Sequence, residues 1–302
     1  MKKILSVIII MIAITLLHHT AWAEWLGPQE IVVGTWGSGS GQFYFGAGDS
    51  GDDFPRDFGV DSRGRIFIND EGNGRIQIYS TTGSLEKAIN APTGVNIYGW
   101  PYNIYVHPDG ALIASYEGPQ KFFFDSSGNF VTKVDVYGPA YPVSQGFILY
   151  VTDKTYSLYS PTGALIRTTT ERPLELGKVS EKKTAAGYTY TIQYPDLVNP
   201  NTVKTYTVSR LYPCSNYTRD KNGNLYCIGD NGVIRFDEQG NEIASVIIPE
   251  SSFQEIPRGP GVEPKIKVIA QYGEPVISPT GDVYTWKRTP ERYSIIKWTW
   301  RP

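Results

Sequence analysis

The sequence predicts an all-β chain built from repeated sheets of four short strands. Two series of turn glycines carry this prediction: the first runs Gly64, Gly110, Gly146, Gly187, Gly223 and Gly281, and the second, 17 to 19 residues later, runs Gly83, Gly128, Gly163 and Gly240. Each glycine closes a turn between apolar or aromatic runs, because such turns need residues that tolerate positive φ or bond their own backbone. Two hairpin turns in a unit of about 43 residues are typical of a propeller blade. Six such units predict a six-bladed β-propeller.

Residues 1–23 have the pattern of a secretory signal peptide. Lys2 and Lys3 precede an apolar stretch from Ile4 to Leu17, and residues 21–23 form a small-x-small cleavage site. The stretch is too short for a spanning helix, and no later apolar run reaches spanning length. We therefore expect an exported protein, periplasmic or secreted, with no membrane span. Its propeller would occupy residues 24–302.

The charge of the chain argues against one class of partner. The formal net charge is −2 and becomes −4 when Lys2 and Lys3 leave with the signal peptide. No basic block stands out, so nucleic-acid binding is not expected. The 279 residues after the signal peptide are enough for one large β domain with a full core, and we expect a monomer.

The units differ in regularity along the chain. The first has expected strands at 58–61, 65–69, 75–79 and 84–89, and the second, third and fifth cover 101–134, 140–169 and 215–248. In the fourth we expect a hairpin of Gly187–Tyr194 and Val203–Ser209 behind a polar inner strand near Lys178–Lys183. Residues 249–272, rich in Pro, Gly and charge, are expected to form a long rim loop or lid.

The last unit predicts how the ring closes. After Gly281 it has only two further strands, Val283–Lys287 and Tyr293–Trp300, so its outer strand is missing. The segment Glu30–Trp36 is a spare strand ahead of the first unit. Pairing this strand with Tyr293–Trp300 would cover the exposed edge and close the propeller.

The first unit resembles the NHL repeat over residues 34–89. The matching residues are Gly34 to Gly41, Phe43, Pro55, Gly59 to Asp61, Gly64 to Phe67, Asp70, Asn73 and Arg75 to Tyr79. The resemblance implies a six-bladed propeller of the NHL-repeat or TolB-like kind. It also implies that Asp70, Asn73 and Arg75 join the second and third strands by hydrogen bonds. The glycines between Gly37 and Gly48 are interpreted as a flexible rim segment.

Both cysteines lie in the fifth unit, on either side of the turn at Gly223. Cys214 precedes one strand and Cys227 lies in the next, nearly facing it across the hairpin. In an oxidising compartment this arrangement favours a disulfide; the other interpretation is two separate buried thiols. His107 is the one histidine after residue 23 and lies in a hairpin turn, which argues against histidine-rich metal sites.

Four polar residues share one position in the repeat. Asp57, Asn103, Asn216 and Glu274 each stand seven residues before a turn glycine, at the start of an inner strand. Inner strands line the channel of a propeller, so these side chains would converge at one mouth. Three interpretations remain open: a solvated channel, a mouth for a ligand or peptide, and a Ca²⁺ site, since Ca²⁺ takes six to eight such oxygen ligands.

The expected function follows from the fold and this mouth. We expect a non-catalytic binding scaffold for a protein, peptide or surface ligand, with no obligatory cofactor. The alternative is an enzyme: the mouth is loosely similar to that of Ca²⁺-dependent lactonases of the gluconolactonase type, whose Glu and Asn ligands would match Glu274 and Asn216. The fuller motifs of those enzymes are absent from this sequence.

Overall fold

The computed structural model describes residues 24–48, 51–95, 100–115, 118–151, 155–185, 187–210, 214, 216–229, 232–256 and 265–301. The expected signal peptide, residues 1–23, lies outside the described residues. Within them the helical elements are two 3-10 turns, η1 (Glu71–Asn73) and η2 (Leu174–Leu176), which confirms the all-β prediction. None of the helices in these ranges is long and apolar enough to cross a membrane.

In the part of the chain that the structure describes, eight hairpin turns share one set of backbone hydrogen bonds. At Asp61, the N–H of Gly64 donates to the Asp61 carbonyl at 3.0 Å, and the Asp61 N–H donates to the Arg65 carbonyl at 3.1 Å. The Asp61 carboxylate accepts two further N–H bonds, from Arg63 and Arg65. The same backbone pair recurs in the turns that begin at Ser80, His107, Asp125, Ser160, Asp220, Asp237 and Ser278. The glycine at the fourth position has positive φ in all eight, as the sequence predicts.

Gly146 and Gly187 do not belong to this series. Val143 pairs with Gly146, and Thr184 pairs with Gly187, so each glycine follows a loop of two residues. Both glycines close short turns as predicted, but these turns are tighter hairpins than the five-residue turn found at the other positions.

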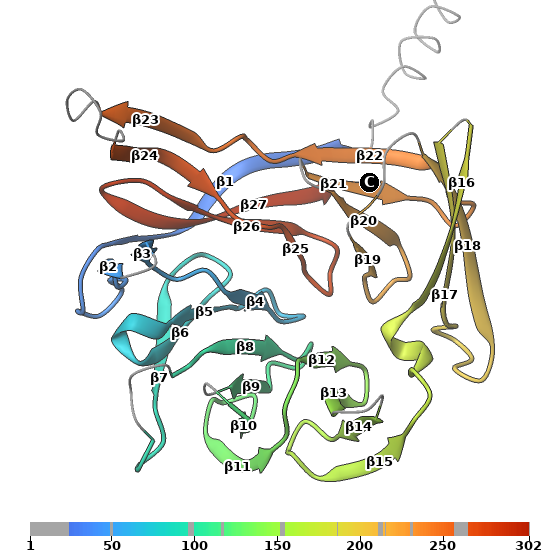
Figure 1. Ribbon diagram of the computed structural model, residues 1–302, viewed down its shortest axis with the longest axis horizontal. Helices are drawn as coiled ribbons and strands as arrows, with labels where there is room; N and C mark the ends of the chain where they lie inside the picture. Colours follow the sequence, from blue (N-terminus) through green and yellow to red (C-terminus); the bar gives the residue numbers. More distant parts are fainter. Residues whose placement is uncertain are drawn as a thin grey trace, which may run out of the picture.

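Four blades have four antiparallel strands in sequence order (Figure 1). The first contains β4 (Phe58–Val60), β5 (Ile66–Asp70), β6 (Arg75–Tyr79) and β7 (Leu85–Asn90), and the second β8 (Asn103–Val106), β9 (Leu112–Ser115), β10 (Gln120–Phe124) and β11 (Phe130–Asp135). The third contains β12 (Ala140–Val143), β13 (Gly146–Val151), β14 (Thr155–Tyr159) and β15 (Leu165–Thr169), and the fifth β19 (Asn216–Arg219), β20 (Leu225–Gly229), β21 (Gly232–Phe236) and β22 (Glu242–Ile247). The first strand of each lies nearest the middle of the ring.

The sixth blade closes the ring with the N-terminal strand, as predicted. It contains β25 (Val276–Ile277), β26 (Val283–Arg288) and β27 (Arg292–Arg301), and β1 (Glu24–Thr35) pairs with β27 from Glu24 opposite Arg301 to Thr35 opposite Arg292. Glu30 adds ion pairs to Lys287 at 3.1 Å and to Arg292 at 2.7 Å. The two ends of the described chain are thus joined in one sheet.

The segment expected to be a rim loop is largely a hairpin. β23 (Ser252–Ile256) pairs with β24 (Lys265–Tyr272), and β24 continues onto β26 through Gln271 and Tyr272. The reason is that β25 covers only two residues of β26, so the rest of β26 has a free edge with which β24 pairs. Residues 257–264 lie outside the described residues. A second small hairpin, β2 (Gly46–Gly48) with β3 (Gly51–Asp53), precedes the first blade.

The fourth blade has three strands, β16 (Lys178–Thr184), β17 (Gly187–Pro195) and β18 (Val203–Arg210). In other blades the outer turn glycine contacts the outermost strand of the blade before it: Gly83 lies against Ile31 of β1, and Gly128 lies against Ile89 of β7. Gly240 of the fifth blade contacts Thr207 of β18 in the same way. β18 is therefore the outermost strand, and β16 stands in the second position.

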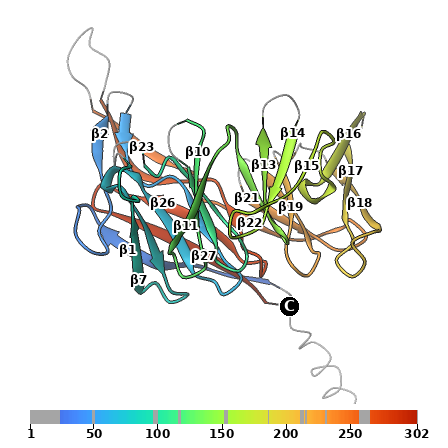
Figure 2. The ribbon, with the colours of Figure 1, turned by 90° about the horizontal axis from the view of Figure 1, so that it is seen from below.

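The innermost strand of the fourth blade is absent from the described residues. The sequence predicts Lys178–Lys183 as the innermost strand of this blade. In the structure it stands second from the inside, since β17 and β18 follow it toward the rim. The short η2 helix lies beside β12 and β17 instead. Figures 1 and 2 show β16, β17 and β18 at one side of the ring.

The core consists of apolar clusters between neighbouring blades. Separate clusters join blades six and one, one and two, two and three, four and five, and five and six. The remaining cluster contains Val143, Ile148 and Leu158 of the third blade, covered by Leu176 of η2 and Tyr156. No residue of β16, β17 or β18 belongs to it. The boundary between blades three and four is therefore the one that blade strands do not fill with apolar side chains.

Candidate functional site

Three of the four predicted mouth residues occupy one register position in the strand ladders. Asn103 pairs with Ser115, and Asn216 pairs with Ile228. Asp57 continues the register of β4, because its carbonyl accepts the N–H of Asn69 at 2.9 Å. Glu274 lies outside this register, because Gly273 donates its N–H to the Trp286 carbonyl at 3.0 Å while Val276 pairs with Tyr284, so two residues, Glu274 and Pro275, lie opposite one residue of β26.

The side chains of this set have different surroundings. Asp57 is half-buried, and its Oδ2 accepts the N–H of Ile104 in the next blade at 2.7 Å. Burial raises the pKa of the Asp57 carboxyl from 3.8 to about 6, against the lowering effect of the Ile104 and Phe58 N–H groups. Asn216 is exposed, and its Oδ1 accepts the N–H of Tyr217 at 2.8 Å. Glu274 is exposed.

Calcium ligation by this set would need rearrangement. Among the described residues, no hydrogen bond or ion pair joins two of the four side chains. Those ranges also contain no group of three or more His, Cys, Asp or Glu side chains placed to hold a metal ion. Oxygens of Asp57 and Asn216 already accept backbone N–H bonds, which Ca²⁺ would have to share or displace.

Asp70 organises the glycine-rich segment in front of the first blade. Its Oδ2 accepts from Asn73 at 2.9 Å, from Arg75 at 2.8 Å and from Gln77 at 3.0 Å. Arg75 also donates to three backbone carbonyls of residues 38–42. The segment interpreted as flexible is thus bound to the blade up to Tyr44, whose N–H donates to Asp70 Oδ1. The bond between Asp70 and Arg75 joins β5 to β6, which is the structural role that the NHL resemblance implies for these residues.

His107 also has a structural place. Its ring is buried, with Nε2 2.8 Å from the Val143 carbonyl of the third blade and Nδ1 2.8 Å from the Asp109 carboxylate. The ring therefore connects two blades at a turn.

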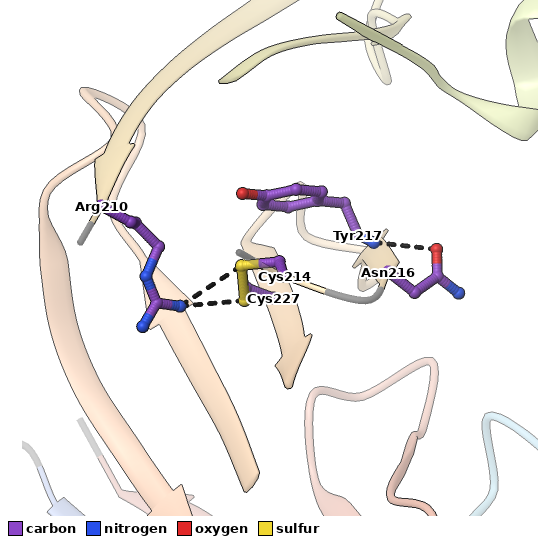
Figure 3. Close-up of a disulfide and its surroundings, with 5 residues drawn as sticks. All are labelled: Arg210, Cys214, Asn216, Tyr217 and Cys227. Atoms are coloured by element: carbon purple, nitrogen blue, oxygen red, sulfur yellow. Dashed lines mark hydrogen bonds between the residues drawn. A yellow bond between two sulfur atoms is a disulfide. The ribbon is translucent and has the colours of Figure 1, made fainter. Parts of the chain in front are cut away.

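Cys214 and Cys227 form the predicted disulfide, with Cα atoms 5.8 Å apart (Figure 3). Cys227 pairs with Tyr217 in the ladder, so the bridge runs from the segment before β19 to β20. Arg210, the last residue of β18, donates to Cys227 Sγ at 2.9 Å and lies 3.3 Å from Cys214 Sγ. The bridge and Arg210 thereby fasten the outer strand of the fourth blade to the fifth.

Among the strands at the inner side of the five blades compared, β16 has the most exposed residues. All seven of its residues are exposed, whereas each of β4, β8, β12 and β19 has at least one buried residue. β17 pairs with one edge of β16, and within the described chain no strand or backbone hydrogen bond occupies the other. Because the described residues contain no innermost strand for this blade, the N–H and C=O groups of that edge have no backbone partner among them and could pair with another chain.

The two faces of the fourth blade differ in polarity. Cross-strand pairing places Tyr190, Ile192, Tyr206 and Val208 on one face, and all four are buried against the fifth blade. Apart from Pro195 and Val203 at one end, the opposite face contains polar side chains: Lys178, Ser180, Lys182, Thr189, Thr191, Gln193, Thr205, Thr207 and Ser209. None of these nine residues is buried. This polar face is the one that the apolar cluster of the third blade does not reach.

Sequence reasoning missed this edge, although the signal was present. The stretch Lys178–Thr184 contains one apolar residue, Val179, and has no alternation that would place a face in the core. Inner and second strands of the other blades are rich in Ile, Val, Leu and Phe. A polar strand in a position that is otherwise buried indicates that the covering strand is missing.

No family model matches this chain, and no curated protein sequence matches it. Among solved structures, BamB from Moraxella catarrhalis is similar at 10% identity and a TM-score of 0.35, over 82% of this chain and 83% of its own. A streptogramin B lyase is similar at 11% identity and a TM-score of 0.39, over 82% and 93%. Kuenenia stuttgartiensis hydrazine synthase is similar at 11% identity and 0.39, over 76% and 73%. Such distant likenesses carry no argument about function.

Proposed function

We propose that this protein is an exported, non-catalytic scaffold that binds an extended segment of a partner protein along β16. The observation that carries the proposal is the free edge of β16, exposed at all seven residues in the place where other blades have a further strand. An added strand would complete the fourth blade. Main-chain hydrogen bonds would supply affinity, and alternate side chains would supply specificity.

The surroundings of β16 support a site for a polypeptide. Seven residues of strand span about 23 Å, enough for a short linear segment. β17 and β18 hold β16 in place, because their buried face packs on the fifth blade and Arg210 bonds to the disulfide there. A partner would therefore meet a rigid edge and would lose little of its binding energy to ordering the protein.

Two finer assignments belong to this proposal. The Asp70, Asn73 and Arg75 bonds support an NHL-like origin for the first blade. The charge and apolar pattern of residues 1–23 supports export to the periplasm or the medium, the compartment in which the Cys214–Cys227 disulfide would persist.

The test uses proline substitutions on the full chain. Of two neighbouring residues in β16, one directs its N–H toward β17 and the other toward the free edge. Val179→Pro and Ser180→Pro therefore separate the two edges, and a random peptide library displayed on phage provides ligands. We expect one proline variant to keep the Tm of the parent but to lose binding of the peptides selected on the parent. We expect the other variant to have a lower Tm.

Two results would contradict the proposal. One is a selection that enriches no peptide, or peptides that bind both proline variants as well as the parent. The other is a dimer of the free protein, seen by sedimentation, that the same proline substitution dissociates. In that case the edge pairs with a second copy of this chain.

The Ca²⁺-dependent lactonase remains the second proposal. Its support is the shared register of Asp57, Asn103 and Asn216 at the starts of inner strands, with Glu274 next to the equivalent position in the sixth blade. The bonds already made by Asp57 and Asn216 count against it, so we place it second.

A further inference from the structure

We infer that the segment bound by β16 carries acidic side chains four residues apart on one face, and this inference rests on the proposed function. The observation is the placement of Lys178 and Lys182, which lie on the polar face of the blade, four residues apart on the same strand. On an added strand, every second side chain would lie on this same face, beside the two lysines.

The two lysines are available to a partner. Both are exposed, and within the described chain neither takes part in an ion pair. Four residues of strand place them about 13 Å apart, a spacing that residues i and i+4 of a paired strand reproduce. A residue paired across two strands has its Cβ about 5 Å from its partner, which is close enough for a Lys–Glu ion pair.

The position between the lysines favours a small polar side chain. Ser180 lies between them on the same face, and the neighbouring β17 residues of that face are Thr189, Thr191 and Gln193. The Ser180 hydroxyl would form a hydrogen bond with threonine or serine paired opposite it at position i+2 of the segment, whereas an apolar side chain there would gain no apolar neighbour on this face.

The other face of β16 has a different character. Val179 is 48% exposed, and Lys183 lies with its Nζ 5.6 Å from the centre of the Tyr188 ring. Glu181 stands between them, so acidic groups on this side would meet a like charge. Apolar residues at positions i+1 and i+3 of the segment fit this face best. The pattern that follows is acidic-apolar-hydroxyl-apolar-acidic.

The experiment compares two labelled peptides of identical composition by fluorescence anisotropy. The first contains Glu-Val-Thr-Val-Glu, which places both acids on one face, and the second contains Glu-Val-Thr-Glu-Val, which places them on opposite faces. Lys182→Glu and Lys183→Glu are the matched variants, because both make the same change in net charge on opposite faces of one strand.

We expect the parent to bind the first peptide about fivefold more tightly than the second. Lys182→Glu should remove that preference, while Lys183→Glu should keep it. In the double variant Lys178→Glu with Lys182→Glu, a peptide with Lys in place of both Glu residues should bind better than the acidic one.

The outcomes separate this inference from the proposed function. If both peptides bind equally and the edge-specific proline variant abolishes both, strand addition stands and the acidic pattern is wrong. If the preference survives Lys182→Glu and is lost in Lys183→Glu, the segment uses the other face and the inference is also wrong. If neither peptide binds while selected peptides do, the inference fails alone. Binding that is insensitive to both proline variants overturns the proposed function together with the inference.

Discussion

Asp57 illustrates how a polar residue at the start of an inner strand holds neighbouring blades together. Its carboxylate accepts the backbone N–H of Ile104 in the second blade, and its own carbonyl continues the ladder of the first. This bond fixes how β8 of the second blade is aligned with β4 of the first. The cost is a half-buried charge, which explains why the carboxyl pKa lies above its ordinary value.

This raised pKa leads to a pH prediction. A carboxyl whose pKa rises from 3.8 to about 6 on folding binds its proton more tightly in the native state, so stability falls as pH rises through that window. Asp57→Asn keeps an oxygen that accepts from Ile104 and removes the titration. We expect the Tm of the variant, relative to the parent, to increase between pH 4 and pH 6 and to stay level above that range. A constant Tm difference across this range would show that Asp57 does not titrate there.

Calcium provides a second test at the residue scale. If Asp57, Asn103, Asn216 and Glu274 ligate Ca²⁺, the ion raises the Tm of the parent by mass action, and Asp57→Asn with Glu274→Gln abolishes the increase. Because two of the four side chains already bond to backbone N–H groups, we expect no change in Tm with millimolar Ca²⁺. A Ca²⁺-dependent increase that the double variant removes would restore the lactonase proposal to first place.

At the scale of single elements, the recurrent turn explains why so much of this fold is visible in the sequence. An Asp or Ser that accepts N–H bonds, followed three residues later by glycine, is encoded locally and needs no information from the rest of the chain. Seven of the eight such turns begin with Asp or Ser, and their strands were predicted. Only His107 departs, and its ring nitrogen takes the acceptor role.

The elements that were not predicted depend on distant partners. β24 forms because β26 has an uncovered edge, and β16 is exposed because its covering strand is missing. The pairing of β24 is not encoded locally, since it follows from what lies beside β26 in the ring, whereas the polar sequence of β16 is a local sign of its exposure. The common register of Asp57, Asn103 and Asn216 was predictable from the turn spacing, while the bond from Asp57 to Ile104 and the register shift at Glu274 were not.

A matched pair of glycines tests the contact between an outer turn and the closing strand. Gly83 and Gly94 both have φ +84°, but a Cβ on Gly83 would clash with the Ile31 carbonyl of β1, while Gly94 has nothing within 4 Å. Gly94→Ala should cost about 1 kcal/mol of unfolding free energy from backbone strain alone. Gly83→Ala should cost about 2 kcal/mol more, because β1 must shift. Chemical denaturation measures both, and equal losses would show that β1 does not pack on this turn.

At the scale of the whole molecule, the ring has one strong closure and one weak boundary. The closure joins β1 to β27 through a long ladder and the ion pairs of Glu30. The weak boundary lies between blades three and four, where the polar face of the fourth blade contributes nothing to the apolar cluster. The exposed edge of β16 lies beside this weak boundary.

Deletion of residues 24–37 tests the closure. Without β1 the edge of β27 is unpaired and buried apolar residues such as Val32 are lost, so we expect a Tm lower by several degrees or aggregation. Glu30→Gln is the mild control, since it removes only partly exposed ion pairs and should lower the unfolding free energy by less than about 1 kcal/mol. A deletion variant that melts with the parent would contradict ring closure by this strand.

The most direct test of a binding edge at β16 is hydrogen–deuterium exchange of the full chain, with and without the Glu-Val-Thr-Val-Glu peptide. In the free protein we expect the segment 178–184 to exchange faster than β5, β9 or β20, which occupy the same position in complete blades. With the peptide at saturation, protection should appear at 178–184 and be absent in the edge-specific proline variant. Protection confined to the starts of β4, β8 and β19, with 178–184 unchanged, would place the ligand at the channel mouth and contradict the account.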